Sequence, residues 1–325
     1  MPIPKITLLP LVIMMFLIAT ALIAEEKDPP EEESDLKHLP QPAPERDETL
    51  RNQAVAAQLA LTDKTTEVTW LGSGKEQFLA LYLPDSSGKP FVNTLILHDN
   101  LQNPDWPGVI RSLRKELTRG GWNTLSIAVP DYQPRPAIPP LKPDQPEATG
   151  RVLEELDTEA TEPEAMSEDN DEPAQTMDDR APEDQVPEEL SQRILLATQY
   201  INGKNNYPLV IIAVGSSATL LLKQAQSGSL NDVNGLVIID PLPLPGLKDI
   251  DLEMAESDLR IPLLDIAPEF NPRSDPEPRA ANARRRQQSL YQQRILRGSN
   301  RDFNGAEQRL MKTVRGWAEK LFRRQ

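Results

Sequence analysis

The chain of 325 residues contains no cysteine and only two histidines, His38 and His98. The absence of cysteine excludes disulfide bonds, thiolate metal ligands, a cysteine nucleophile and acylation at an N-terminal cysteine. Histidine is a frequent metal ligand, but two distant histidines make no credible metal cluster. Glycine is also scarce, and no glycine-rich phosphate loop is present. We therefore expect neither a metal site nor a cofactor site.

The acidic charge of the chain is concentrated in one segment. The whole chain carries −15, but residues Asp144 to Glu189 hold 18 acidic residues and two arginines, a net of −16, so the remainder is +1. Segments rich in proline and acid bury too little apolar area to offset the entropy lost on ordering. We predict a disordered acidic insertion at residues 134–187 and a disordered linker at residues 25–48.

The first 24 residues combine Lys5, a long apolar stretch and small residues near Ala24. This pattern is typical of a secretory signal peptide. The alternative is an uncleaved inner-membrane anchor formed by residues 6–24, because the apolar run approaches the ~20 residues that span a bilayer. Both interpretations predict export, with the periplasm as the expected location.

Residues 49–325 are predicted to form one α/β domain around the insertion. The run from Pro208 to Val214 is apolar and too short for a typical helix, which favours a strand buried on both faces. Strands are expected at 67–71, 77–83, 92–98, 122–129, 208–214, 233–239, 261–267 and 293–296, and helices at 48–61 (with Leu50, Ala54, Ala57 and Leu61 on one face), 107–119, 188–201, 279–291 and 305–322. An antiparallel hairpin followed by alternating strands and helices predicts an α/β-hydrolase-like fold, with a mainly parallel sheet and helices on both faces.

A serine turn follows the strand at 208–214. A strand, a tight turn bearing serine and a helix form the nucleophile elbow, G-x-S-x-G. Gly215 takes the first place and Ser217 the serine place, but Thr219 stands where the second glycine belongs. Ser217 is therefore the candidate nucleophile. The alternative is that Ser216 or Ser217 caps the helix that follows.

The base and acid of a catalytic triad are harder to find. Such a triad needs an acid after a later strand and a histidine near the C-terminus. No histidine follows His98, and Asn300 or Asp302 occupies the expected place. Glu269, Asn271 and Asp275 are the candidates for the acid. Asparagine is no base, and Asp302 would put a carboxylate in the place of the imidazole, so we expect no complete Ser-His-acid triad.

His98 ends the strand at 92–98 and is the remaining candidate base. A histidine at this point more often shapes the oxyanion loop by bonding to backbone, so we predict a structural role. Asp99 follows it, and a carboxylate beside an oxyanion hole would repel developing negative charge.

The C-terminal part, residues 279–325, holds 13 basic residues against three acidic ones. Three interpretations remain: a solvated helix face, docking onto the acidic insertion of the same chain, and contact with anionic lipid headgroups. We expect no nucleic acid partner for an exported chain with few aromatic residues.

Several short motifs suggest a family. They are Leu97-His98-Asp99, Pro104-Asp105-Trp106-Pro107, Leu113-Arg114, Gly121-Trp122, Thr124-Leu125-Ser126 and Gly316-Trp317. Over about residues 51–321, outside the insertion, the chain resembles a proteobacterial family of exported proteins known as a domain of unknown function, DUF3530. The resemblance implies an α/β-hydrolase fold. The chain departs from the family by Asp99 in place of glycine and by lacking the late histidine.

These observations predict an exported α/β-hydrolase-like protein without hydrolase activity. It would act as a binding or scaffold module at the cell envelope, with an envelope protein or a lipid surface as partner. The alternative is an unconventional, esterase-like serine hydrolase that uses Ser217.

Overall fold

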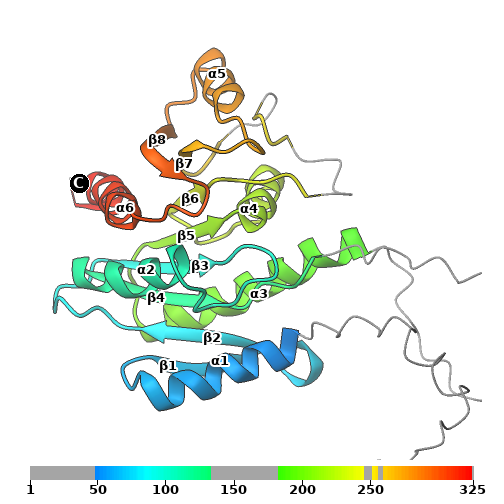
Figure 1. Ribbon diagram of the computed structural model, residues 1–325, viewed down its shortest axis with the longest axis vertical. Coiled ribbons are helices and arrows are strands. Elements are labelled where there is room, and N and C mark those ends of the chain that lie inside the picture. The colour runs from blue at the N-terminus through cyan, green and yellow to red at the C-terminus, as the bar shows by residue number, and fades with distance from the viewer. Residues whose placement is uncertain (1–47, 133–181, 245–250, 255–258, 324–325) are drawn as a thin grey trace, which may run out of the picture. The chain divides into compact units, whose positions relative to one another are not determined.

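The computed structural model describes residues 48–132, 182–244, 251–254 and 259–323, which contain a sheet in the order β1-β2-β4-β3-β5-β6-β7-β8 (Figure 1). The strands are β1 (Glu67–Leu71), β2 (Phe78–Leu83), β3 (Val92–Leu97), β4 (Trp122–Ile127), β5 (Leu209–Val214), β6 (Gly235–Ile239), β7 (Leu263–Phe270) and β8 (Tyr291–Asn300). Strand β2 pairs antiparallel with β1 and β4, and the other neighbours are parallel. Strand β5 lies in the interior between β3 and β6, which confirms the prediction from its apolar run.

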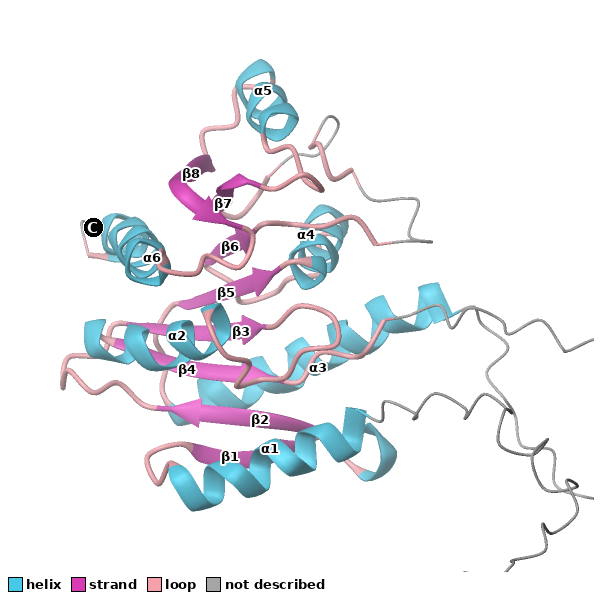
Figure 2. Ribbon diagram, in the orientation of Figure 1, coloured by secondary structure: helices cyan, strands magenta, loops and turns pink. Residues whose placement is uncertain are grey.

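Helices cover both faces of this sheet (Figure 2). The helices are α1 (Glu48–Thr62), α2 (Val109–Glu116), α3 (Pro182–Lys204), α4 (Ser216–Ser227), α5 (Glu277–Arg285) and α6 (Glu307–Phe322), with 3-10 turns η2 (Gly74–Glu76) and η3 (Leu117–Gly120). Side chains alternate between the two faces of a strand. Ile211 of β5 therefore joins the core under α1, α3 and α4, whereas Ile212 joins the core under α2 and α6.

Helix α3 begins earlier than the sequence predicts. It starts at Pro182, inside the predicted insertion 134–187, and Val186 is buried. Val186, Leu190, Ile194 and Ala197 recur at helical spacing and pack into the core, so the apolar pattern extends the helix despite the neighbouring acids. The rest of the insertion, the linker before Glu48 and the predicted signal peptide or anchor lie outside the described residues.

The C-terminal elements also differ in their bounds from the prediction. Helix α5 ends at Arg285, and strand β8 starts at Tyr291, where the predicted helix was to end. Gln287 has a φ of 52°, and a residue in the left-handed region cannot continue a right-handed helix. This turn frees the following residues to pair with β7.

Helix α1 has the predicted extent but presents the predicted apolar face to solvent. Its inward face carries Asn52 and Leu59, which are buried. Leu50 is 63% exposed and Leu61 is 81% exposed. None of the helices in the described part of the chain has the length and hydropathy of a membrane span.

Candidate functional site

The turn between β5 and α4 has the backbone shape of a nucleophile elbow. Gly215 has φ 63° and ψ −127°, and α4 begins at the next residue. In an elbow the nucleophile occupies the strained residue of the strand-to-helix turn. The residue in that conformation is Gly215, two positions before Ser217, so the elbow's nucleophile position carries no side chain. The sequence match to G-x-S-x-G had placed the serine position at Ser217.

The side chain of Asp99 occupies the space in front of Gly215. A Cβ atom built on Gly215 would lie 2.3 Å from the Asp99 carboxyl carbon. The Asp99 carboxylate Oδ1 accepts hydrogen bonds from the backbone N–H groups of Ser216 and Asn100, both at 2.8 Å, and from the Ser216 hydroxyl. In this fold the oxyanion hole consists of the N–H after the nucleophile and an N–H from the loop after β3. Ser216 and Asn100 stand at these two places. The protein's own carboxylate therefore occupies the oxyanion hole.

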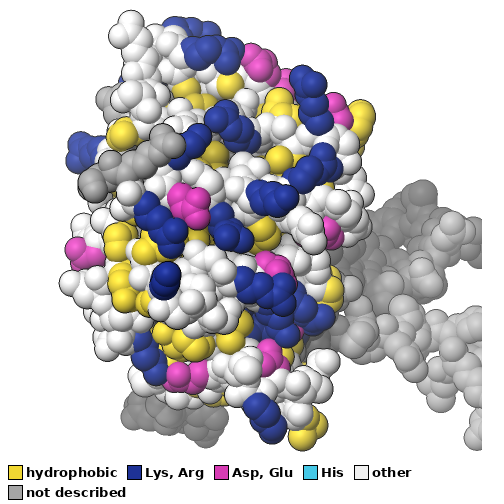
Figure 3. All heavy atoms as spheres, turned by 90° about the vertical axis from the view of Figure 1, so that its left-hand side faces the viewer, with side chains coloured by type: hydrophobic (Ala, Val, Ile, Leu, Met, Phe, Trp, Pro, Cys, Tyr) yellow, Lys and Arg dark blue, Asp and Glu magenta, His cyan; other side chains and the backbone are white. Residues whose placement is uncertain are grey.

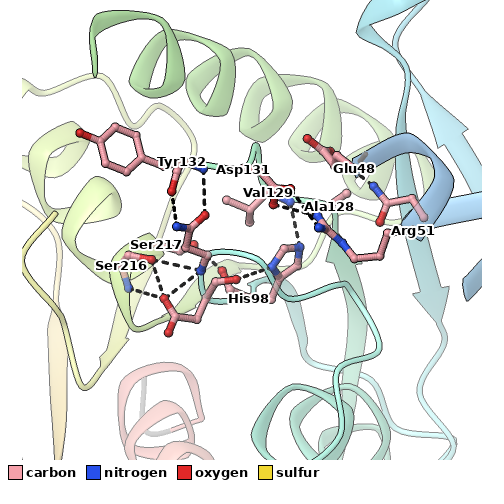
Figure 4. Close-up of polar contacts among 12 residues, drawn as sticks. Glu48, Arg51, His98, Ala128, Val129, Asp131, Tyr132, Ser216 and Ser217 are labelled. Atoms are coloured by element: carbon pink, nitrogen blue, oxygen red, sulfur yellow. Dashed lines mark hydrogen bonds and ion pairs between the residues drawn. The ribbon is translucent and has the colours of Figure 1, made fainter. Parts of the chain in front are cut away.

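His98 holds the ends of β3 and β4 together (Figure 4). The Val129 N–H donates to Nε2 at 3.0 Å, and Nδ1 lies 2.8 Å from the Asp99 carbonyl oxygen. Since an amide N–H only donates, Nε2 is the acceptor and Nδ1 carries the proton. Burial lowers the pKa of His98 to about 3, so the imidazole is neutral. His98 thus bonds backbone through both ring nitrogens, and its structural role stays a prediction.

Ser217 lies in the first turn of α4, and its hydroxyl is buried. It donates a short hydrogen bond to the His98 carbonyl oxygen, not to the imidazole. The hydroxyl of Ser216 bonds to Asp99 instead of capping α4. The two serines therefore attach the helix to the loop after β3.

The loop after β3 is held from two sides. Asn100 forms a pair of hydrogen bonds with the backbone N–H and carbonyl of Tyr132 (Figure 4). Further along, Asp105 accepts hydrogen bonds from Arg111 and from the fully buried Arg114. These contacts fix the segment that carries Asp99. They also explain two motifs noted in the sequence, Pro104-Asp105-Trp106-Pro107 and Leu113-Arg114.

The end of β8 and the loop after it, where the late histidine was expected, carry no histidine. Asn300 is exposed, and its side chain accepts the Asn304 N–H at 3.2 Å. Its neighbours Arg301 and Asp302 face the site, and Arg301 lies 3.5 Å from Asp99 Oδ2. Position 300 itself is therefore occupied by a turn-forming side chain.

The acid of the site is Asp240, which the sequence analysis missed. It follows β6 directly, is 3% exposed and accepts two hydrogen bonds from the Asn271 amide at 2.7 and 2.8 Å. Burial raises the pKa of Asp240 to about 6, and the Asn271 amide opposes that rise. Of the predicted acid candidates, Asn271 contacts this carboxylate, whereas Glu269 binds the Gly298 N–H and Asp275 binds the Glu277 N–H. A carboxylate ending a buried strand, Ile238-Ile239-Asp240, was the available signal.

A cavity of about 360 Å³ joins these groups at the carboxyl ends of β3, β5 and β6. Ligands of open α/β sheets bind at this edge. Asp99, Asp240, Asp302 and Arg301 line it together with Trp106. His98 is not among its lining residues. Among the described residues, no group of three metal-ligating side chains is present.

Only some of the basic side chains in residues 279–325 are exposed on the surface. Arg279 is buried and forms an ion pair with Asp265 at 2.8 Å. On α6, Arg309, Lys312 and Lys320 are exposed. Figure 3 shows Lys and Arg side chains spread over one face of the molecule, with acidic side chains among them.

The strand order, the elbow and the position of the cavity define an α/β-hydrolase fold. The chain is similar to a soluble variant of monoglyceride lipase from Saccharomyces cerevisiae, with a TM-score of 0.54, 9% identity, and coverage of 81% of this chain and 97% of that one. It is also similar to Est1E from Butyrivibrio proteoclasticus, with a TM-score of 0.51, 10% identity, and coverage of 78% of this chain and 98% of that one. An esterase from Pyrococcus furiosus is similar with a TM-score of 0.51, 9% identity, and coverage of 81% of this chain and 93% of that one. At these identities the similarity concerns the fold.

The family described as "Protein of unknown function (DUF3530)" matches residues 6–320, and the chain belongs to it. This confirms the family resemblance. No curated protein matches the sequence.

Proposed function

We propose that this protein is a non-catalytic binding module with an α/β-hydrolase fold, which acts at the cell envelope and holds a small polar ligand in the cavity beside Gly215. One observation carries the proposal. The carboxylate of Asp99 fills the oxyanion hole and the space in front of the elbow residue. A group of the protein thus stands where an enzyme of this fold would stabilise its transition state.

Three requirements of acyl transfer argue against an esterase. The strained elbow residue, Gly215, has no nucleophilic side chain. The two oxyanion donors are engaged by a negative charge, which opposes a second negative charge at the same point. A serine nucleophile also needs a base within hydrogen-bond reach. Ser217 instead bonds to a backbone carbonyl, and its neighbour His98 binds backbone through both nitrogens.

The chemistry of the cavity favours a ligand that donates hydrogen bonds. Asp240 and Asp302 offer acceptor oxygens, whereas the cation Arg301 already faces Asp99. Trp106 lines the same cavity and is 40% exposed, so it offers an aromatic face. An amine or a polyhydroxylated compound fits this set of groups, because ionised carboxylates only accept hydrogen bonds.

Catalysis is tested on the purified full chain with a fluorophosphonate probe and with short and medium nitrophenyl esters. We expect neither labelling nor turnover in the wild type. Ser217→Ala is the diagnostic variant, and Ser216→Ala is its control. Turnover that disappears in Ser217→Ala and persists in Ser216→Ala would establish the serine hydrolase alternative and contradict the proposal.

Ligand binding is tested by thermal unfolding in the presence of amines, polyols and small carboxylates. A ligand at 100 times its Kd stabilises the folded state by about 2.7 kcal/mol, which raises the Tm of a chain of this size by roughly 5–10 °C. Asp302→Asn should abolish the shift, whereas Glu253→Gln, an exposed carboxylate outside the cavity, should preserve it. A shift produced by carboxylates alone, or one that survives Asp302→Asn, would contradict this assignment of the cavity.

A further inference from the structure

The outward face of α1 carries an apolar stripe, and none of its exposed residues within the helix is charged. Leu50 and Leu61 are 63% and 81% exposed, and the exposed Ala54 and Ala57 lie between them. Leu61 is the most exposed of the large apolar side chains in the described part of the chain. Single exposed leucines are common on monomers. A stripe at helical spacing of i, i+4, i+7 and i+11 has the pattern of a helix face that packs on a partner.

The sequence of the exposed residues on this face is also nearly the same in both directions along the helix. Eight of the nine exposed positions of α1 form four matched pairs about a midpoint between Val55 and Ala56: Thr49 with Thr62, Leu50 with Leu61, Gln53 with Gln58, and Ala54 with Ala57. The ninth, Ala60, has Arg51 as its counterpart and lies at the flank of the face. The inward positions of α1 do not share the symmetry, since Asn52 is matched by Leu59. The symmetry is therefore a property of the exposed face.

We propose that a second copy of this chain covers this face, so that two α1 helices pack antiparallel across a two-fold axis. Such an axis requires a surface that is complementary to itself. In this register Leu50 of each copy meets Leu61 of the other, and Gln53 meets Gln58. Ala54 and Ala57 meet at the centre, where small side chains let the helix axes approach to about 8 Å.

Charge supports a second copy over a membrane surface. Helices that lie on membranes carry Lys and Arg on their polar face. The charged side chains of α1 are Glu48 and Arg51, and both bind within the fold. Glu48 pairs with Arg193, and Arg51 pairs with Asp131 (Figure 4). Within α1 the outward face is thus neutral. Lys64, just past the end of the helix, donates to the Ala60 carbonyl, and its two copies would lie about 25 Å apart along the axis in this register, so the two faces meet without repulsion.

The contact is small. A helix of 15 residues is about 22 Å long, and one helix pair covers less than the ~800 Å² per partner of a stable complex. We therefore expect a reversible dimer that forms at micromolar or higher concentration, in place of an obligate one.

The register is tested by cysteine cross-linking, which the absence of native cysteine makes clean. Leu50→Cys and Leu61→Cys chains, purified with different tags, are mixed and oxidised. We expect disulfide-linked heterodimers from the mixture and little product from either chain alone. Two copies of residue 50 would lie about 16 Å apart along the axis, beyond the ~7 Å limit between Cα atoms that a disulfide bridges. Gln308→Cys, exposed on α6, is the control and should not cross-link.

A charge at the centre of the face tests the same contact without oxidation. Ala57→Glu brings two carboxylates close to the axis, and we expect the dimer to weaken more than tenfold in sedimentation equilibrium, since like charges in contact cost several kcal/mol. Gln308→Glu changes the charge equally on α6 and should leave the dimer unchanged.

Three outcomes would overturn the proposal. One is a dimer that survives Ala57→Glu. Another is Leu50→Cys cross-linking to itself as readily as to Leu61→Cys. The third is a monomer that binds phosphatidylcholine and phosphatidylglycerol vesicles in a manner abolished by Leu61→Ser, which would assign the face to a lipid surface.

Discussion

Replacing Asp99 by alanine should convert the internally filled oxyanion hole into an anion-binding site. The substitution removes the acceptor of the Ser216 and Asn100 N–H groups, which both lie 2.8 Å from the carboxylate. It also removes the partner of Arg301. Two backbone donors, one hydroxyl and one cation would then face an empty position.

The size of the effect follows from these contacts. Hydrogen bonds to a charged group contribute about 1.5–3 kcal/mol each, so the loss of the two backbone bonds and the hydroxyl bond has an upper bound of about 9 kcal/mol. The cavity of about 360 Å³ has room for water that re-satisfies the donors. We therefore expect a net loss of about 1–3 kcal/mol, which lowers the Tm by roughly 3–10 °C.

The assay uses formate, because formate can supply the carboxylate that the Asp99→Ala protein lacks. With a Kd of about 10 mM, 100 mM formate would return about 1.4 kcal/mol. The measurement is the Tm of wild type and Asp99→Ala in formate and in sodium chloride of equal ionic strength. Wild type should show no formate-specific shift, since its hole is filled. Asp302→Ala, which removes another carboxylate of the same cavity, should also show none.

An Asp99→Ala protein as stable as wild type and indifferent to formate would refute this reasoning. That result would mean that Asp99 does not occupy the hole in solution. A formate shift of equal size in Asp302→Ala would mean that the anion binds elsewhere in the cavity.

Three other predictions follow from the same geometry. Gly215→Ser should cost about 2–4 kcal/mol, from strain at positive φ and contact with Asp99, and Asp99→Ala should relieve at least ~1 kcal/mol of that cost in a double-mutant cycle. Because folding raises the pKa of Asp240 from 3.8 to about 6, its carboxyl stabilises the fold at low pH, and this contribution is lost as the pH rises through 6. As the pH rises from 4 to 7, the free energy of unfolding of Asp240→Asn should thus increase by roughly 1–3 kcal/mol relative to that of the wild type. Melting curves of both proteins at the two pH values measure this difference. Arg279→Ala, which leaves the buried Asp265 carboxylate without its cation, should cost about 3–5 kcal/mol in urea unfolding, whereas Asp265→Asn in that background should recover part of it.

Much of the candidate site could be located from the sequence. The buried run at 208–214 placed β5 in the sheet interior, and strand ends of a parallel sheet share one edge. The lack of a histidine after His98 is visible in the sequence. The exact elbow residue could not be identified from the sequence, because Gly215-Ser216-Ser217 matches the serine motif in a register that the backbone does not adopt. Only the φ and ψ of Gly215 identify it as the strained residue.

The sequence by itself determined the order of strands and helices, because periodicity and apolar runs reflect burial on one or two faces. It also determined the family and the absence of a late imidazole. Only the tertiary structure decided that Asp99 enters the oxyanion hole, since its partner Ser216 is 117 positions away and no local pattern encodes that contact. The same holds for Asp240, and for α1, where two opposite faces are apolar enough to pack. In the structure the face of α1 that carries Val55, Ala56 and Leu59 packs on the core, and Glu48 and Arg51 pair with distant residues.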